Sequence, residues 1–406
     1  MTGAVPRGRG RYLILLDDNV EGARSIARLG RLEAASTAEL TVSEAAGMLA
    51  EMDGLLFDQL GVAVVTATPE QADALLGAVP VDGPISQVEP DRTVRAISAA
   101  PATEPAGPAR PAGPAGPAGP AGVDESTFTW GLRTLGVPES TATGSGVRLA
   151  VLDTGFDVGH PDFAGRTLVT RSFVSGQDVA DGHGHGTHVT GTACGPRVVA
   201  SGPGYGVAFE CEGYLGKVLG DDGSGSDSGI LGGISWAVDN GCAVVSLSLG
   251  ATAEPGQPFS RTFEAVARRA MRRGTLIVAA AGNESSRAGG VVAPVGHPAN
   301  CPSVLAVGAV DVAGAVADFS SGTVDEDSAV DLVGPGVEVY SSWPMPERNR
   351  KLSGTSMATP HVAGVAALLA QRHGARGWAL WARLGQASRR LPLPSTDVGA
   401  GLVRAP

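Results

Sequence analysis

The C-terminal two thirds of the chain alternates short apolar runs with segments of helical spacing. The apolar runs lack polar alternation, as do strands buried on both faces of a sheet; they are Val147–Leu152, Tyr214–Leu219, Ala243–Leu249, Thr275–Ala281 and Val304–Val310. Helical stretches fall between and after them, near 186–194, 228–239, 260–272 and 356–371. This order predicts an α/β domain over residues 124–406, with a mostly parallel sheet and helices on both of its faces.

A second and smaller pattern occupies the beginning of the chain. Strands are expected at Tyr12–Leu16, Leu55–Leu60, Val62–Thr66 and from Ile85 through Val88 to Val94, and helices at Val20–Leu29 and Glu70–Leu76. Pro69 stands where a helix accepts proline, in its first turn. The order β-α-β-β-α-β is a split βαβ arrangement. Residues 1–96 are therefore predicted to contain a small α+β, ferredoxin-like domain.

Residues 97–123 differ in composition from both domains. From Gly107 onward the segment repeats Gly, Pro and Ala, with one interruption at Arg110. Four or five such triplets are too few for a collagen triple helix. Proline and glycine without larger apolar residues predict an extended, exposed linker, which a protease can cut.

Composition and charge restrict the classes of function. The 406 residues include 43% hydrophobic residues and carry a formal net charge of −11. A sizeable core is therefore available, while the acidic balance argues against nucleic acid and anionic membranes as partners. The apolar run Tyr12–Leu16 is too short for a signal peptide and ends at Asp17. We expect a protein that either stays inside the cell or depends on an export signal outside this sequence, so the compartment stays open.

The four cysteines are Cys194, Cys211, Cys242 and Cys301. None forms a C-x-x-C pair, which argues against a zinc site or a redox dithiol. Buried free thiols are the favoured interpretation. One disulfide, between Cys194 and Cys211, is the alternative.

Three short segments carry the candidate chemistry, each with one reactive side chain among small residues. They place Asp153 in Leu152–Gly155, His185 in Gly184–His188 and Ser356 in Gly354–Pro360. A hydroxyl is a poor nucleophile until an imidazole takes its proton, and a carboxylate can hold that imidazole in the right tautomer. A metal site at the histidines 183, 185 and 188 is the weaker alternative, because no carboxylate or cysteine lies at ligand spacing.

These segments, taken with several blocks between and after them, resemble the subtilisin-like serine peptidases. The blocks are Val245–Gly250, Ala279–Asn283, Pro302–Ala309 and Gly401–Val403, in the order that the family shows. The resemblance covers roughly residues 130–403. It implies a catalytic triad of Asp153, His185 and Ser356, an acyl-enzyme on Ser356, and hydrolysis of peptide bonds. It also implies an oxyanion hole formed by the Asn283 amide and Ser356, and Thr355 could assist.

The same resemblance implies a groove for an extended peptide. Its walls would be two segments that pair with the substrate as added strands: Gly223, Ser224 and Gly225, and Ser248, Leu249 and Gly250. The first specificity pocket would be lined by Ala280, Ala281, Gly282 and Gly296. Small walls leave room for a large apolar or aromatic side chain, and Glu284 at the rim could admit arginine or lysine.

The small N-terminal domain resembles the inhibitor-type propeptide of subtilisin-like zymogens, and Val88–Arg92 matches the way such propeptides end. The resemblance implies a zymogen whose own propeptide is an intramolecular inhibitor, with peptides or proteins as the other partners and a monomeric enzyme. A permanent accessory domain is the alternative. For the whole protein, the alternatives are a maturation peptidase for one precursor peptide and an inactive binding scaffold.

No cofactor is expected. The family often has an Asn-rich, calcium-binding loop, but Arg197–Gly204 stands in its place. Asp162 matches a calcium ligand of the family, yet the missing loop argues against that site. Calcium elsewhere, as a structural ion, stays open.

Overall fold

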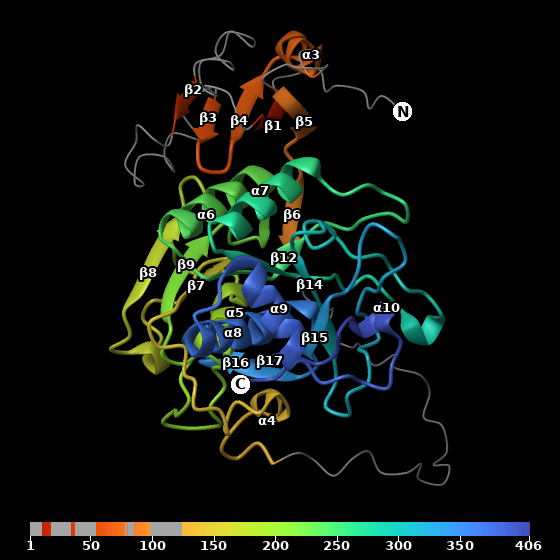
Figure 1. Cartoon of the computed structure of the whole chain (residues 1–406). Coiled ribbons are helices and arrows are strands. Elements are labelled where there is room, and N and C mark those ends of the chain that lie inside the picture. The colour runs from red at the N-terminus through yellow and green to blue at the C-terminus, as the bar shows by residue number, and fades with distance from the viewer. Residues whose placement is uncertain (1–9, 18–33, 37–53, 78, 80–84, 98–123) are drawn as a thin grey trace, which may run out of the picture.

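The computed structural model describes residues 10–17, 34–36, 54–77, 79, 85–97 and 124–406. The helix expected over Val20–Leu29 and all of the linker after Ile97 lie outside these residues. The two domains of the described chain are stacked, with the smaller one on top in Figure 1.

A seven-stranded sheet forms the centre of the larger domain. All of its neighbouring strands are parallel, in the order β15-β14-β13-β11-β7-β9-β8. They are β7 (Arg148–Asp153), β8 (Leu168–Ser172), β9 (Glu212–Lys217), β11 (Val244–Leu247), β13 (Leu276–Ala280), β14 (Leu305–Val310) and β15 (Leu332–Pro335). The predicted parallel sheet is confirmed. The pattern missed the edge strands β8 and β15; β8 is half-exposed and so lacks a continuous apolar run.

Helices cover both faces of this sheet, as predicted. On one side lie α6 (Asp227–Asp239) and α7 (Arg261–Arg272), and on the other α5 (His185–Cys194) and α8 (Thr355–His373) (Figure 1). α8 is buried from Thr355 to Ala370 and contacts five strands of the sheet, β7, β11, β13, β14 and β15. The sequence did not predict α4 (Trp130–Leu135), α9 (Gly377–Ala387) and α10 (Ser395–Val398). Within the described ranges, no helix is both long and apolar enough to cross a membrane.

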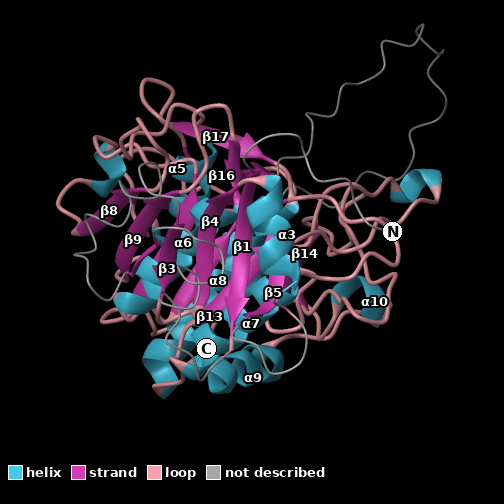
Figure 2. Cartoon of the chain, turned by 90° about the horizontal axis from the view of Figure 1, so that it is seen from above, coloured by secondary structure: helices cyan, strands magenta, loops and turns pink. Residues whose placement is uncertain are grey.

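The small domain is a five-stranded sheet in the order β2-β3-β4-β1-β5. Its elements are β1 (Gly10–Leu16), β2 (Ala34–Ser36), β3 (Gly54–Phe57), β4 (Val62–Ala67), α3 (Pro69–Gly77) and β5 (Ile85–Pro90). Side chains alternate across a strand, so β1 serves two cores: Ile14 packs in the small domain, while Leu13 and Leu15 join the core of the large domain. This sheet lies over α6 and α7, as Figure 2 shows from above.

The last predicted strand of the small domain is in fact two strands in different sheets. β5 ends at Pro90, and β6 (Thr93–Ala96) leaves the domain. It runs antiparallel between β10 (Ser224–Ser226) and β12 (Leu249–Gly250) of the large domain (Figure 1). Strands as short as β10 and β12 leave unpaired backbone groups, and a third strand between them satisfies these groups. The expectation that Val94 continues the small sheet is therefore wrong.

A hairpin of β16 (Val339–Ser342) and β17 (Asn349–Leu352) completes the described strands, and β16 packs on α5.

Candidate active site

Asp153 and His185 meet where a strand ends and a helix begins. Asp153 is the last residue of β7 and His185 is the first of α5. The imidazole Nδ1 lies 2.7 Å from the Asp153 carboxylate, and both side chains are about 1% exposed. Burial opposes the charged imidazolium, yet the charge and hydrogen bond of Asp153, with the charge of Asp181, hold the pKa of His185 above its ordinary value. This pair can therefore accept a proton and stabilise it.

Asp181 organises the start of α5, a role that the sequence analysis missed. The helix begins after Gly184, which has no capping side chain. The Asp181 carboxylate takes its place by accepting the N–H groups of Gly184 and Thr187, both at 2.7 Å. It also accepts the Thr154 hydroxyl at 2.8 Å, and Thr154 receives the N–H of Gly186. These bonds tie the end of β7 to the start of α5. The available signal was an acidic residue just ahead of a helix without a cap.

Ser356 is the second residue of α8, at the helix end where backbone N–H groups lack partners within the helix. Its hydroxyl donates to two carbonyl oxygens, that of Ile97 and, at 3.1 Å, that of Ser248. Nε2 of His185 has no hydrogen-bond partner among the described residues. The structure thus joins the Ser356 hydroxyl to the carbonyl oxygens of Ile97 and Ser248, and not to the imidazole of His185.

The Asn283 carboxamide is held by one of its ends. Its oxygen accepts the N–H of Thr355 at 2.8 Å and the Thr355 hydroxyl at 2.9 Å. The amide end, Nδ2, is left to donate to the carbonyl oxygen of Ile97 at 3.3 Å. The orientation of the amide follows from these contacts, because only the oxygen can accept from Thr355.

The two predicted groove segments lie on either side of β6. On one side, Gly225 pairs with Val94, and the Ala96 N–H donates to the Gly223 carbonyl at 2.9 Å. On the other side, Leu249 pairs with Ala96. This register carries the carbonyl of the next residue, Ile97, to Ser356 and Asn283.

A cavity of about 510 Å³ opens beside Ile97. Among the residues that line it are Gly250, Gly282, Glu284 and Gly296. A Cβ at Gly282 would come within 2.5 Å of the Glu284 carboxylate, so glycine keeps that wall open. Two of the predicted wall residues, Ala280 and Ala281, are buried and do not belong to the lining.

The other histidines of the cluster differ from His185. Burial lowers the pKa of His188 to about 3, and its Nε2 contacts the carbonyls of Val339 and Arg350. It is a packed, neutral side chain, as expected. His183 lies beside Gly223, with its Nδ1 unpaired.

The cysteines are buried and free in the structure, which agrees with the favoured interpretation. The thiol of Cys194, the last residue of α5, interacts with that of Cys211.

The residues around Asp162 do not fit a calcium ion. One carboxylate oxygen accepts Nη2 of Arg348 at 2.5 Å, and the other accepts the Tyr205 hydroxyl at 2.8 Å. A guanidinium thus occupies the position in which a cation would balance this buried charge. Elsewhere in the described chain, no three His, Cys, Asp or Glu side chains gather as metal ligands do.

A parallel α/β sheet with a buried Asp–His pair at a strand end and a serine at a helix start is typical of one class of protein, the serine peptidases. Residues 144–387 match the family model described as the Subtilase family. This match covers more than half of the chain, and the chain belongs to that family. It is a serine endopeptidase, and an Asp-His-Ser triad is the general mechanism of the family.

Curated relatives agree with this assignment. Subtilisin Savinase from Lederbergia lenta is 42% identical over 282 residues, which are 68% of this chain and 96% of the relative. The M-protease of Shouchella clausii is 40% identical over 321 residues, which are 78% of this chain and 71% of the relative. Subtilisin E of Bacillus subtilis is 42% identical over 233 residues, 57% of each chain.

Proposed function

We propose that Ser356 is the nucleophile of this endopeptidase, with His185 as general base and acid and Asp153 as its partner. Nε2 of His185 takes the hydroxyl proton while Oγ bonds to the carbonyl carbon of the substrate. The imidazolium then gives that proton to the departing amine, and the C–N bond breaks. Water repeats the sequence on the acyl-enzyme, which releases the acid and restores Ser356. Asp153 holds Nδ1–H and stabilises the charge at each stage.

The oxyanion hole would consist of the Ser356 backbone N–H and Nδ2 of Asn283. The start of α8 aims N–H groups at developing negative charge. Thr355 fixes the Asn283 oxygen, so Nδ2 is oriented before the substrate arrives. Preorganised donors of this kind act mainly on the transition state.

We further propose that residues 1–96 are an inhibitory propeptide, which makes the protein a zymogen. One observation carries this proposal: the Ile97 carbonyl oxygen contacts both the Ser356 hydroxyl and Nδ2 of Asn283. The chain's own strand β6 thus lies as a substrate would, and the bond after Ile97 is the one presented for cleavage. Moreover, the alignment with the M-protease covers 78% of the chain, slightly more than residues 97–406 contain, so it includes residues of this region.

Two acidic side chains just before β6 support a docked domain. Glu89 accepts the Ser260 hydroxyl at 2.6 Å and the Thr262 N–H at 3.0 Å, at the start of α7. Asp91 accepts the N–H and hydroxyl of Ser228, at 2.9 and 2.7 Å, at the start of α6. Carboxylates are favourable at helix N-termini, so the small domain holds the large one through complementary charge as well as apolar packing.

We propose no cofactor for this chemistry, peptides and proteins as substrates, and a monomeric enzyme. The Arg348 contact to Asp162 supports stability without a calcium ion at that position.

The nucleophile is tested by Ser356→Ala, with Ser353→Ala as a matched control on the same segment. The Ser353 hydroxyl accepts the Glu338 N–H and lies outside the site. Casein hydrolysis and labelling of Ser356 by phenylmethylsulfonyl fluoride should disappear in the first variant and persist in the second. Substantial hydrolysis by Ser356→Ala would refute the assignment.

A further inference from the structure

A buried carboxylate with a free oxygen lies near the groove, away from Ser356. Asp227, the first residue of α6, is 0% exposed. Its Oδ1 lies 2.9 Å from Nε2 of His297, whose ring packs edge-on against Phe263 with centroids 4.6 Å apart. Its Oδ2 has no hydrogen-bond partner in the described structure. A carboxylate buried in this way needs a positive partner, because burying an unpaired charge is costly.

The partner is Arg92, the residue just before strand β6. Nη1 of Arg92 lies 3.5 Å from Oδ2 of Asp227. The backbone is fixed as well, because the Asp227 N–H donates to the Arg92 carbonyl at 3.0 Å. From there the pairing of Ser226 with Thr93 sets the register to the end of β6. Arg92 is the fifth residue before Ile97, whose carbonyl lies at Ser356.

We propose that Asp227 is a specificity-determining residue, which selects peptides with arginine or lysine five positions before the residue whose carbonyl is attacked. The inference rests on the proposed function, in which β6 occupies the groove as a substrate does. In the uncleaved chain Glu89 shares the Arg92 guanidinium, through Nη2 at 3.2 Å. A free peptide can bring any residue to the position of Glu89, whereas Asp227 belongs to the enzyme.

The ion pair acts on selection. Oδ2 of the buried carboxylate gains a partner when a cationic side chain arrives, and it stays without one when an apolar side chain does, while Oδ1 keeps its contact with His297. The Arg92 side chain as a whole is 29% exposed, whereas Nη1, the atom nearest Asp227, is buried, so the pair is partly desolvated. We expect a preference of about 5- to 20-fold in kcat/KM, the range of a partly desolvated charge pair.

The test uses internally quenched peptides with the sequence of residues 89–100, in three forms: unchanged, Arg92→Ala and Arg95→Ala. They are cleaved by the wild-type protein after self-processing, by Asp227→Asn and by Asp222→Asn. Asp222 is the control because it is exposed and bonds to Ser224 rather than to Arg92. With the wild-type enzyme and with the Asp222→Asn enzyme, the Arg92→Ala peptide should have a kcat/KM about 5- to 20-fold lower than the unchanged peptide. With the Asp227→Asn enzyme, the ratio of kcat/KM between these two peptides should fall below about 2. The Arg95→Ala peptide should not depend on Asp227. Equal rates for the first two peptides, or the same loss with Asp227→Asn, would overturn the inference.

A second measurement does not depend on hydrolysis. In full-length Ser356→Ala, hydrogen exchange of the β6 amides should speed up about 5-fold or more on Arg92→Ala, and less on Arg95→Ala. If exchange is faster in Arg92→Ala than in Arg95→Ala but neither peptide nor casein is cleaved, the proposed function is refuted and the Asp227–Arg92 ion pair is supported. Equal exchange in the two variants would overturn the pair itself.

Discussion

The Asn283 carboxamide, the proposed oxyanion donor, is oriented by its neighbours. Thr355 occupies its oxygen from the backbone and from the hydroxyl, and Nδ2 has only the Ile97 carbonyl oxygen to meet. The Gly282 N–H in turn donates to the Thr355 hydroxyl at 3.2 Å. Nδ2 of Asn283 is thus oriented by Gly282 and Thr355, the sequence neighbours of Asn283 and Ser356, without a contribution from the substrate.

Asn283→Ala should lower kcat by about 10²- to 10³-fold, because the lost donor acts mainly on the oxyanion of the transition state. KM should change little. Steady-state kinetics on a short peptide measure both, with Asn300→Ala, at a buried asparagine outside the site, as the control. An effect confined to KM would show that Asn283 binds the ground state instead.

At this scale the sequence predicted the candidate reacting residues and gave no indication of the residues that hold them in place. Asp153, His185 and Ser356 stand in short small-residue segments whose order already indicates their chemistry. Asp181 has no such signal, since an acidic residue ahead of a helix is common in any fold. Its contacts to Thr154 and Thr187 appear only when β7 and α5 are brought together.

Among the elements, β6 is the one that sequence patterns could not place. The apolar character of Val88 and Val94 suggests one strand, and alternation cannot tell which sheet a strand joins. Its actual partners, β10 and β12, lie more than a hundred residues away in the chain. The buried strands β7, β9, β11, β13 and β14 were predictable because continuous apolar runs need no knowledge of partners.

Besides the bonds of Glu89 to the start of α7, Arg269 in the last turn of that helix bonds to the small domain. Arg269 donates to the carbonyl oxygens of Leu60 at 2.6 Å, Gly61 at 3.1 Å and Leu16 at 3.0 Å. The turn at Gly61 has φ +58°, and a Cβ there would lie 2.6 Å from Nη1, so glycine allows the close approach. Charge-assisted bonds of this kind are the stronger hydrogen bonds of an interface.

Arg269→Met should therefore loosen the docked domain. In the full-length protein, we expect peptide hydrolysis to begin about 10-fold sooner, because loss of these bonds weakens binding by roughly 1.5–3 kcal/mol. Arg268→Met is the control, since that exposed side chain pairs with Glu264 of its own helix. Equal onset in both variants would exclude Arg269 as an anchor.

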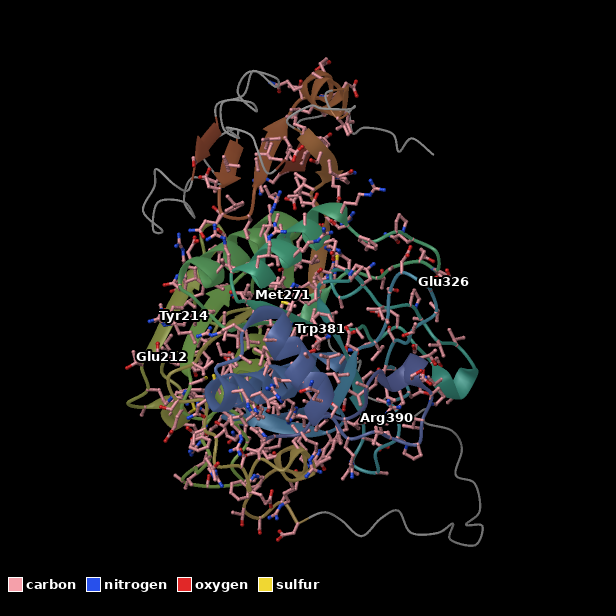
Figure 3. All side chains as sticks on the ribbon, viewed as in Figure 1. Glu212, Tyr214, Met271, Glu326, Trp381 and Arg390 are labelled. Atoms are coloured by element: carbon pink, nitrogen blue, oxygen red, sulfur yellow. The ribbon has the colours of Figure 1, made fainter. Side chains whose placement is uncertain are left out.

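The segment between β16 and β17 takes part in holding the region of Asp162. Arg348 pairs with this carboxylate, which is 3% exposed, while the Tyr205 hydroxyl bonds to its other oxygen. The acidic loop at Glu326, which precedes this segment in the chain, lies at the outer edge of the molecule (Figure 3). The cation that balances Asp162 is thus part of the chain.

EDTA should consequently change the melting temperature only modestly, whereas Arg348→Ala should lower the free energy of unfolding by about 1–3 kcal/mol. Thermal unfolding measures the melting temperature and denaturant unfolding measures the free energy, both in the Ser356→Ala background, which prevents self-digestion. Lys351→Ala, which removes an exposed pair with Glu125, should cost no more than about 1 kcal/mol. A large fall in melting temperature with EDTA, reversed by Ca²⁺, would reveal a calcium site that this account lacks.

At the scale of the whole molecule, one continuous chain is both enzyme and occupant of its own groove. The small sheet packs on α6 and α7, the acidic residues 89 and 91 meet the starts of these helices, and β6 then enters between β10 and β12. Hydrophobic patterns predicted the two domains and composition predicted a linker, which after Ile97 lies outside the described residues. The bond presented to Ser356 depends on strand register, which only the structure supplies.

Mass spectrometry of the purified protein during incubation tests this arrangement most directly. The wild type should first split after Ile97, into residues 1–97 and 98–406, while Ser356→Ala stays one chain. The register of β6 is the reason, because it brings the Ile97 carbonyl to Ser356 and Asn283. A wild-type chain that hydrolyses peptides while remaining uncleaved, or that first splits at another bond, would contradict the account.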